Sequence, residues 1–392
     1  MGSQLTIVVS GMVAGVPFQG GAAWAVLQYV LGFKRLGCEV YLIEPVEPAS
    51  LRPAGSPLEA SENAAYFRQV MAAFGLEQTS ALLLAGSAQT VGVPYRTLQE
   101  AARRAELLIN ISGMLTDASL TEPIPARVYL DLDPAFNQLW QAAQGLDMRF
   151  EGHTHFVTVG LSIGRPECPV PTCGRRWITT LQPIILAEWP IAERMTYDAL
   201  TTIANWRGYG SIEHAGVFYG QKAHALRPLI ALPTRTDERF LLALAIHPGE
   251  ERDLAALNAN GWRLLDPAAI AATPAQYREF IQGSKAEFGL AKHGYVASRC
   301  GWFSDRSVCY LASGRPVLAQ ETGFSRFLPT GEGLLAFETA EEALEGIEAL
   351  RRDYASHRRA ARRLAETRFD SDKVLAHLLE QLGADLNVVA RP

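Results

Sequence analysis

The stretch Arg299-Cys-Gly-Trp-Phe-Ser-Asp-Arg-Ser307 runs directly into Val308-Cys-Tyr-Leu-Ala-Ser-Gly-Arg-Pro-Val317. Ser304 or Asp305 can cap a helix over the second part, and Gly314 can end it. The apolar letters that follow Gly314 are typical of a buried strand. Loop, helix, glycine turn and strand in this order indicate an α/β unit whose helix begins at a place suited to an anion.

Several groups near that helix start could hold the anion. Gly301 allows a close backbone approach, and the N–H groups after Ser304 point out of the helix end. Arg299, Arg306 and Lys292 can supply positive charge. Because several donors converge on one loop, the pattern favours a diphosphate over a single phosphate.

Apolar strand-like runs alternate with amphipathic helices through most of the chain. In the first half we expect strands at 5–10, 40–43, 107–111 and 128–132, and helices at 22–36 and 96–105. In the second half we expect strands at 240–246, 262–265, 286–291 and 316–319, and closing helices at 340–352 and 354–367. The segment 152–183 has no clear period and is expected to be ordered loop. Strands that are almost wholly apolar predict parallel sheets covered on both faces.

Size and composition limit the possible classes of protein. The 392 residues suit two domains, since a domain usually has about 100–200 residues. The chain is 48% hydrophobic and 20% charged, which is typical of a globular protein. A net charge of −5 argues against a partner that is nucleic acid.

The cysteines and the N-terminus predict the compartment. Five cysteines at irregular spacing are expected to be reduced thiols, and no Cys/His set has the spacing of a zinc site. The start of the chain has no basic region, and no run approaches the about 18–20 apolar residues of a membrane span. We therefore expect a cytoplasmic protein without a transmembrane segment or a bound metal.

A glycine-rich loop, Val16-Pro-Phe-Gln-Gly-Gly21, lies between the first expected strand and the first helix. Gly20 and Gly21 would let the backbone approach a phosphate or sugar phosphate at the helix start. The same letters also suit an ordinary turn. They match neither the P-loop nor the dinucleotide-binding pattern.

The run from Arg299 resembles the donor-binding segment of GT-B glycosyltransferases. Arg299-Cys-Gly-Trp-Phe-Ser304 corresponds to His-Cys-Gly-Trp-Asn-Ser of the nucleotide-sugar family, and a helix, a Gly-x-Pro-Val strand and Glu321-Thr-Gly323 follow. The glycine-rich loop and the closing stretch 365–375 are similar to the two ends of retaining GT-B enzymes.

This resemblance implies the GT-B fold, an α/β architecture in which two Rossmann-like domains face each other across a cleft and C-terminal helices close the second. It implies an acceptor-side domain at 1–180, a donor-binding domain at 181–370, and a helix and tail at 371–392. The implied activity is that of a hexosyltransferase-like enzyme, which moves a sugar from a nucleotide-diphosphate sugar to an acceptor. No cofactor or metal would take part, and the acceptor could be a small molecule, a glycan or a peptide.

The resemblance also implies roles for single residues. Arg299, Gly301 and Ser304 would contact the phosphates, and Glu321 with Thr322 would contact sugar hydroxyls.

Two positions depart from the family pattern. Asp305 is the only acid between Gly301 and Gly314, so the Glu-x7-Glu pair of retaining enzymes is absent. Ser307 stands where the ribose-binding glutamate is expected. The sequence therefore predicts neither the nucleoside nor the stereochemistry.

Candidates for a catalytic base lie just past one expected strand and at the start of the central loop. Asp133, just past a strand end, could deprotonate an acceptor, or it could be a turn-forming Asp before Pro. His153 and His155 could serve as base or be satisfied loop histidines. In an extended segment only one of the two would face a given cleft.

Two charged residues elsewhere have equally open roles. Lys222 is either a further phosphate ligand or a solvated surface charge. Glu287, between apolar neighbours at a strand start, either contacts ribose or sugar or is a buried, hydrogen-bonded glutamate.

Two other functions fit the same motifs. A GT-B-like nucleotide-sugar epimerase would share the donor site but would need acid and base groups around the sugar. A non-catalytic sugar-phosphate binding protein would need only the phosphate ligands. The sequence identifies neither the donor sugar nor the acceptor, and it does not predict the oligomeric state.

Overall fold

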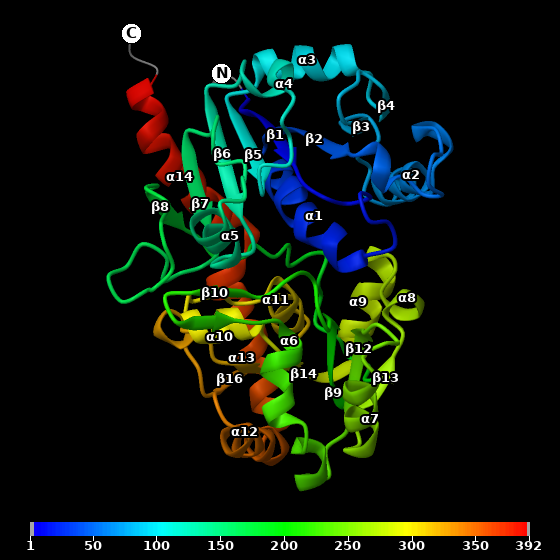
Figure 1. The fold of residues 1–392 in the computed structure, drawn as a ribbon, viewed down its shortest axis with the longest axis vertical. Helices are drawn as coiled ribbons and strands as arrows, with labels where there is room; N and C mark the ends of the chain where they lie inside the picture. The colour runs from blue at the N-terminus through cyan, green and yellow to red at the C-terminus, as the bar shows by residue number, and fades with distance from the viewer. Residues whose placement is uncertain (1–3, 390–392) are drawn as a thin grey trace.

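The computed structural model describes residues 4–389 and contains two α/β sheets stacked end to end (Figure 1). Residues 1–3 of the predicted first domain and residues 390–392 of the predicted tail lie outside the described residues. The predicted boundary at residue 180 falls between the last strand of the first sheet and the first strand of the second. The division into acceptor-side and donor-binding domains stays a prediction.

The first sheet has eight strands in the order β4-β3-β2-β1-β5-β6-β7-β8. All neighbours are parallel except β4, which pairs antiparallel with β3. The bounds are β1 (Thr6–Ser10), β2 (Glu39–Val46), β3 (Ser80–Leu84), β4 (Thr90–Gly92), β5 (Leu107–Ile111), β6 (Ala126–Asp131), β7 (His155–Thr158) and β8 (Trp177–Thr179).

The second sheet has six parallel strands in the order β13-β12-β9-β14-β15-β16. The bounds are β9 (Tyr197–Asn205), β12 (Phe240–Ala245), β13 (Arg263–Leu265), β14 (Ser284–Gly289), β15 (Val317–Gln320) and β16 (Leu334–Phe337). A separate hairpin is formed by β10 (Ile212–His214) and β11 (Val217–Tyr219).

Each sheet reverses its strand order at its first strand. In the first sheet β1 lies between β2 and β5, and in the second β9 lies between β12 and β14. Parallel sheets of this kind bind ligands beyond the carboxyl ends of the strands at the reversal point. The helix α1 (Gly20–Arg35) begins after β1, and α11 (Asp305–Ala312) begins between β14 and β15, so both helix starts lie at such ends.

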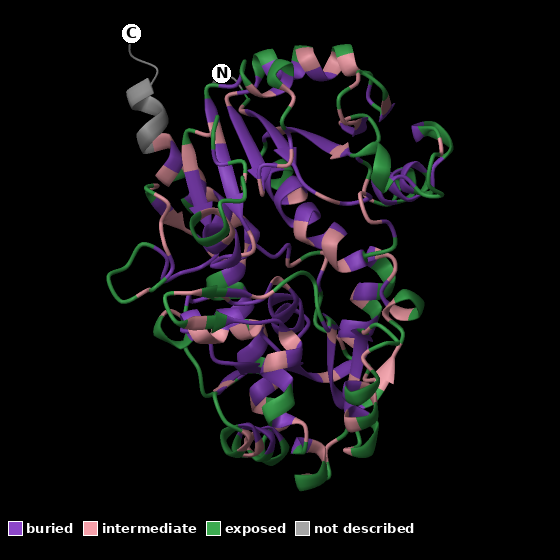
Figure 2. Cartoon of the chain, viewed as in Figure 1, coloured by how far each residue is buried: buried purple, intermediate pink, exposed green. Residues whose placement is uncertain are grey.

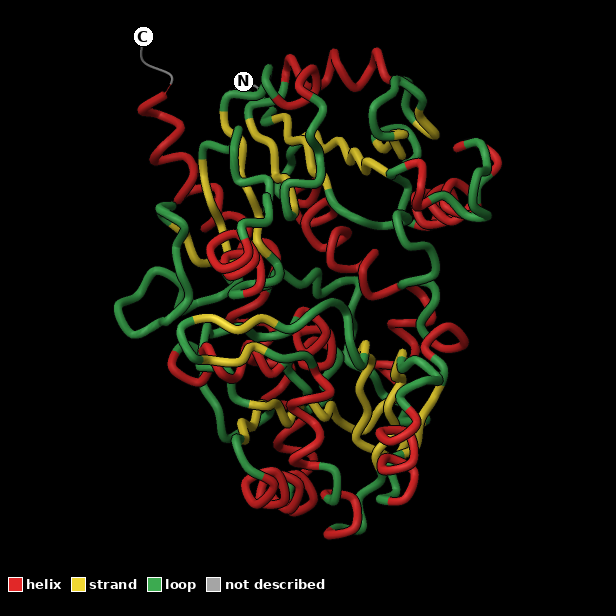
Figure 3. Tube along the Cα trace, viewed as in Figure 1, coloured by secondary structure: helices red, strands yellow, loops and turns green. Residues whose placement is uncertain are grey.

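The segment 152–183 was expected to be loop, and this prediction was wrong in part. It contains β7 and β8, which complete the edge of the first sheet (Figure 3). These strands have four and three residues, which is too short for an alternating pattern to be recognised in the sequence.

The two halves share a core and are joined by the C-terminal helix. One cluster of buried side chains contains Val9 and Leu27 of the first half as well as Tyr310 of α11 and Phe369. Figure 2 shows that buried residues lie inside both halves. The closing helix α14 (Ser371–Val389) returns to α1, as Figure 1 shows. Asp372 of α14 pairs with Arg35 of α1 at 2.9 Å. No helix within residues 4–389 is long and apolar enough to cross a membrane.

The remaining helices cover the sheets. Those not yet given are α2 (Glu62–Ala73), α3 (Tyr95–Arg104), α4 (Ala118–Thr121), α5 (Phe136–Gln144), α6 (Lys222–Leu226), α7 (Glu251–Ala259), α8 (Pro267–Ile270), α9 (Pro274–Gly283), α10 (His293–Ser298), α12 (Ala340–Arg352) and α13 (Tyr354–Leu364).

Candidate functional site

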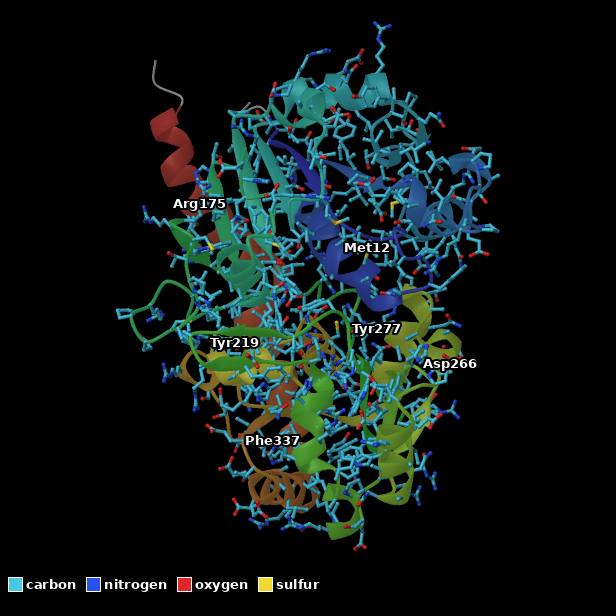
Figure 4. The ribbon with its side chains drawn as sticks, viewed as in Figure 1. Met12, Arg175, Tyr219, Asp266, Tyr277 and Phe337 are labelled. Carbon is cyan, nitrogen blue, oxygen red and sulfur yellow. The ribbon has the colours of Figure 1, made fainter. Side chains whose placement is uncertain are left out.

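A cleft of about 880 Å³ lies between the two domains, at the carboxyl ends of both sheets. The first domain contributes residues 16–22, at the start of α1, and Arg52. The second domain contributes the ends of β9 and β12, the loop at Asp266 with the adjoining residues of β13 and α8 (264–268), Lys222, and the start of α11. Tyr277 of α9 and Asp266 of that loop, both labelled in Figure 4, also line the cleft.

Lys222, the first residue of α6, is a half-buried cation in this cleft. Its ammonium group has no hydrogen bond or ion pair with any residue from 4 to 389. Burial, helped by the positive charges of Arg306 and Lys292 and weakly opposed by Asp133 and Asp305, lowers the pKa of Lys222 from 10.5 to about 7. An anion bound here would stabilise the protonated, positively charged form of Lys222, which burial disfavours.

The start of α11 faces the same space. Asp305 and Arg306, in its first turn, both line the cleft. Ser304 stands at the N-cap position, but its side chain accepts no backbone N–H of the helix and instead bonds to the Asp305 carboxylate at 3.3 Å. The helix start therefore has no side-chain cap, and the Asp305 carboxylate in the first turn offsets part of the positive end of the helix dipole.

A hydrogen bond to Glu287 holds the Arg306 side chain in place. Its Nε donates to Glu287 Oε1 at 2.6 Å and its Nη1 donates to the carbonyl of Ile203 at 3.0 Å, while Nη2 has no partner in the described part of the chain. Glu287 is fully buried and does not line the cleft. Of the two interpretations of Glu287, a buried and hydrogen-bonded glutamate is the one found, and a direct sugar contact is not supported.

The loop that begins at Arg299 has another role, because it contacts the first domain. The carbonyl of Cys300 accepts a hydrogen bond from the backbone N–H of Ser162 at 2.9 Å, and Trp302 forms a β-bridge with Gly160. Gly301 has a φ of +79°, and a Cβ there would lie 2.9 Å from the nitrogen of Ser162. Packing between the domains therefore requires a glycine at this position, and its contact with a phosphate stays a prediction.

Asp133 and Lys292 extend this contact. Lys292 Nζ lies 2.7 and 2.9 Å from the two carboxylate oxygens of Asp133, on the other domain. The hydroxyls of Tyr209 and Tyr295 also bond to Asp133. We call residues 160–162 and 300–302, together with Asp133 and Lys292, the interdomain seam. Neither Asp133 nor Lys292 lines the cleft. The roles of Asp133 as a base and of Lys292 as a phosphate ligand stay predictions.

Other predicted donor ligands also have partners within the protein. Arg299 pairs with Glu338 at 2.6 Å on the surface. The carboxylate of Glu321 accepts the N–H of Gly323, and the Thr322 hydroxyl donates to the carbonyl of Trp302. These three residues, with Gly301, Ser304 and Ser307, do not line the cleft.

The two histidines lie away from the cleft. His153 Nε2 is 3.0 Å from the side-chain nitrogen of Asn110, and the imidazole borders a different hollow of about 370 Å³. Burial lowers the pKa of His153. His155 begins β7 and therefore lies at the amino end of the sheet, whereas the cleft is at the carboxyl ends. Of the predicted residues, the structure brings five to the cleft: Gly20, Gly21, Lys222, Asp305 and Arg306.

The two glycines are needed for close packing of α1 on α9. A Cβ at Gly20 would lie 2.3 Å from the carbonyl oxygen of Thr273, and one at Gly21 would lie 2.8 Å from the Tyr277 ring. Sequence reasoning missed Tyr277, Arg52 and Phe18 at the cleft. Phe18 lies inside the glycine-rich motif and could have been singled out there, but nothing in the local sequence marks the other two. In residues 4–389 no three His, Cys, Asp or Glu side chains are placed to hold a metal ion.

Known proteins with the same architecture identify the fold as GT-B. An alpha-glucosyltransferase, solved with UDP-glucose and DNA containing an abasic site, has a TM-score of 0.59 at 12% identity, covering 96% of this chain and 99% of that one. Sucrose-phosphate synthase from Thermosynechococcus elongatus has a TM-score of 0.57 at 13% identity, covering 97% and 100%. HepE of Anabaena, solved with UDP and glucose, has a TM-score of 0.59 at 10% identity, covering 97% and 100%.

The amino-acid sequence also matches a known family over part of its length. Residues 235–383 match the family described as Glycosyl transferase-like. No curated protein sequence matches the chain. The chain therefore has the GT-B fold, and its second domain is similar to the glycosyl transferase-like family.

Proposed function

We propose that the cleft binds a UDP-sugar and that the enzyme transfers its sugar to an acceptor hydroxyl without a metal ion. The observation that carries this proposal is Lys222, a half-buried ammonium group without a partner among residues 4–389. Burying a cation without a counterion costs free energy, and a diphosphate would supply the negative charge that Lys222 lacks as a partner. Structures of similar GT-B proteins that contain UDP or UDP-glucose support the choice of nucleotide.

The two ends of the second-domain wall suit the two parts of such a donor. Apolar side chains at the ends of β12 and β13, including Leu244, Ile246 and Leu265, suit the nucleoside. Lys222, Arg306 and the uncapped start of α11 suit the diphosphate. This arrangement keeps the predicted helix start but replaces Arg299 with Lys222 as the main phosphate ligand.

In the reaction, the acceptor oxygen forms a bond to the anomeric carbon of the sugar. The bond from that carbon to the diphosphate oxygen breaks, its electron pair leaves with UDP, and the hydroxyl proton is released to solvent. Negative charge grows on the departing diphosphate, next to Lys222 and Arg306. Fixed positive groups at such a position often provide the largest contribution to catalysis, so no metal is needed in this scheme.

Asp305 is the acid of α11 that faces the cleft. We propose that its carboxylate accepts a hydrogen bond from a hydroxyl of the transferred sugar. Asp305 would then orient the anomeric carbon relative to the phosphates, which is a positional effect that enzymes use widely.

Two further predictions belong to this proposal. The first domain, residues 1–180, would hold the acceptor, and residues 181–370 would hold the donor. The five cysteines are all free thiols, which suits a reducing compartment such as the cytoplasm.

Product analysis tests the activity. The enzyme is incubated with each of several UDP-sugars, alone and with a panel of hydroxyl acceptors, and the products are separated by anion-exchange chromatography. Free UDP that accumulates only with an acceptor, together with a glycosylated product, supports transfer. An epimeric UDP-sugar formed without acceptor would indicate the epimerase, and binding without any turnover would indicate a binding protein.

A further inference from the structure

The first-domain wall of the cleft carries a solvent-exposed aromatic ring in an unusual conformation. Phe18 lines the cleft and keeps 43% of its surface exposed. Its φ of +66° lies in the left-handed region, which bulky side chains rarely adopt. The ring of Tyr66 meets it edge-on at 5.3 Å. A strained and exposed aromatic residue at a binding cleft indicates a function for the ring.

Arg52 is the single charged residue among the described cleft residues of the first domain. The side chain is exposed, and its guanidinium group has no hydrogen bond or ion pair with any residue between 4 and 389. A guanidinium presents a planar set of donors that matches a carboxylate or a phosphate. This cation faces the cleft from the wall opposite Lys222.

Two fully buried polar side chains hold this wall in place. Glu44 of β2 accepts hydrogen bonds from the backbone N–H groups of Ala14 at 2.8 Å and Gly15 at 2.6 Å. Asn63 of α2 donates to the carbonyl of Ala14 at 2.7 Å and accepts the N–H of Arg52 at 2.9 Å. One pair of side chains thus fixes both the loop that leads to Phe18 and the backbone of Arg52.

We infer that Phe18 and Arg52 form the acceptor subsite, and that the acceptor is a ring compound with an anionic group, either a carboxylate or a phosphate monoester. The inference rests on the proposed function, since it places the acceptor opposite the donor. The apolar face of a sugar or aromatic ring packs on Phe18, and the anionic group pairs with Arg52. Glu44 is a positioning residue for the loop that leads to Phe18, and Asn63 is one for both that loop and Arg52.

The test uses the full-length enzyme saturated with UDP. Calorimetry measures the binding of a panel of hexoses, each in three forms: the neutral sugar, its 6-phosphate and its uronic acid. For the wild type we expect at least one anionic form to bind about tenfold or more tightly than its neutral form, as a charge-assisted hydrogen bond would give. The phosphate and uronate arms distinguish the two kinds of anion.

Variants test whether Arg52 and Phe18 are responsible for acceptor binding. Arg52→Ala should remove the preference for the anionic form while keeping the affinity for UDP, and Phe18→Ala should weaken the neutral and anionic forms alike. The control is Arg103→Ala, which changes an exposed arginine of α3 outside the cleft and should behave like the wild type.

Different failures have different meanings. Equal binding of neutral and anionic forms by the wild type, or an unchanged preference in Arg52→Ala, would overturn the inference. A loss of UDP binding in Arg52→Ala would also overturn it, because Arg52 would then be a donor ligand. Absence of UDP binding by the wild type would instead overturn the proposed function itself.

Discussion

The cleft and the interdomain seam are neighbouring contacts between the same two domains, yet their charges are arranged in opposite ways. At the seam, Lys292 meets both carboxylate oxygens of Asp133 within 3 Å. In the cleft, Lys222 and Arg52 have no such partner among residues 4–389. Both regions contain basic residues near a glycine and a helix start, so their local sequences look alike.

The difference separates contacts that hold the domains together from contacts that await a ligand. A paired charge is already compensated, and its loss leaves the partner unsatisfied. An unpaired, partly buried charge destabilises the free protein and becomes favourable only when an anion binds. Removal of one lysine from each region should therefore have opposite effects on stability and on nucleotide binding.

The largest expected effect is on catalysis. Lys222→Met should lower the rate of transfer by about 10²–10³-fold, because one fixed positive group next to the leaving diphosphate is lost. Steady-state assays with a UDP-sugar measure the loss. Lys34→Met, a change of an exposed lysine in the last turn of α1, is the control and should leave the rate unchanged. A wild-type rate in Lys222→Met would contradict the claim that the unpaired lysine of the cleft, unlike the paired lysine of the seam, acts on the donor.

The next effect is on stability and belongs to the seam. Lys292→Met leaves Asp133 without its cation, in a site where the aspartate side chain is 27% exposed. Because this site is partly solvated, we expect the free energy of unfolding to fall by about 1–3 kcal/mol, less than for a fully buried pair. Urea denaturation measures the change. UDP affinity should stay within about threefold of the wild type; a fall as large as that in Lys222→Met would place Lys292 at the donor.

The sequence predicts the fold better than it predicts the residues of the site. The apolar runs predicted β1, β5, β12 and the helix α12 closely, because long periodic or fully apolar segments carry their own signal. The central strand β9 was missed, since its polar Thr201 and Thr202 are buried by hydrogen bonding and packing that no local pattern shows.

For the site, the motif predicted the path of the chain but not which residues face the ligand. Gly301 has the letter of a donor site but packs against Ser162 of the first domain, and Thr322 bonds to the loop that carries Gly301. Lys222 was an open choice in the sequence because its surroundings come from segments distant in the chain. Arg52 and Glu44 had no signal, since their importance depends on tertiary contacts alone.

A smaller effect is the pH dependence of stability. The pKa of Lys222 is about 7 in the folded protein and 10.5 when exposed. Between these values the unfolded chain binds more protons, so the free energy of unfolding should rise with pH across this window. Lys222→Met should lack this contribution. Urea denaturation at several pH values tests it: identical profiles for the two proteins would show that Lys222 is not desolvated in the cleft.

The smallest expected effect on stability concerns Phe18. Phe18→Gly should change the free energy of unfolding by less than about 1 kcal/mol, because relief of the left-handed strain offsets the greater freedom of the unfolded chain and the lost contact with Tyr66. The rate of transfer should nevertheless fall, since the ring is lost. Paired unfolding and activity measurements test this. A large loss of stability would mean that Phe18 is mainly a packing residue.

Calorimetry with UDP and with uridine tests the central claim, that the unpaired cations of the cleft bind the donor diphosphate. For the wild type we expect UDP to bind at least about 100-fold more tightly than uridine. In Lys222→Met that ratio should fall to about tenfold or less, while Lys292→Met should retain it. Equal affinities for UDP and uridine in the wild type, or an unchanged ratio in Lys222→Met, would contradict the account.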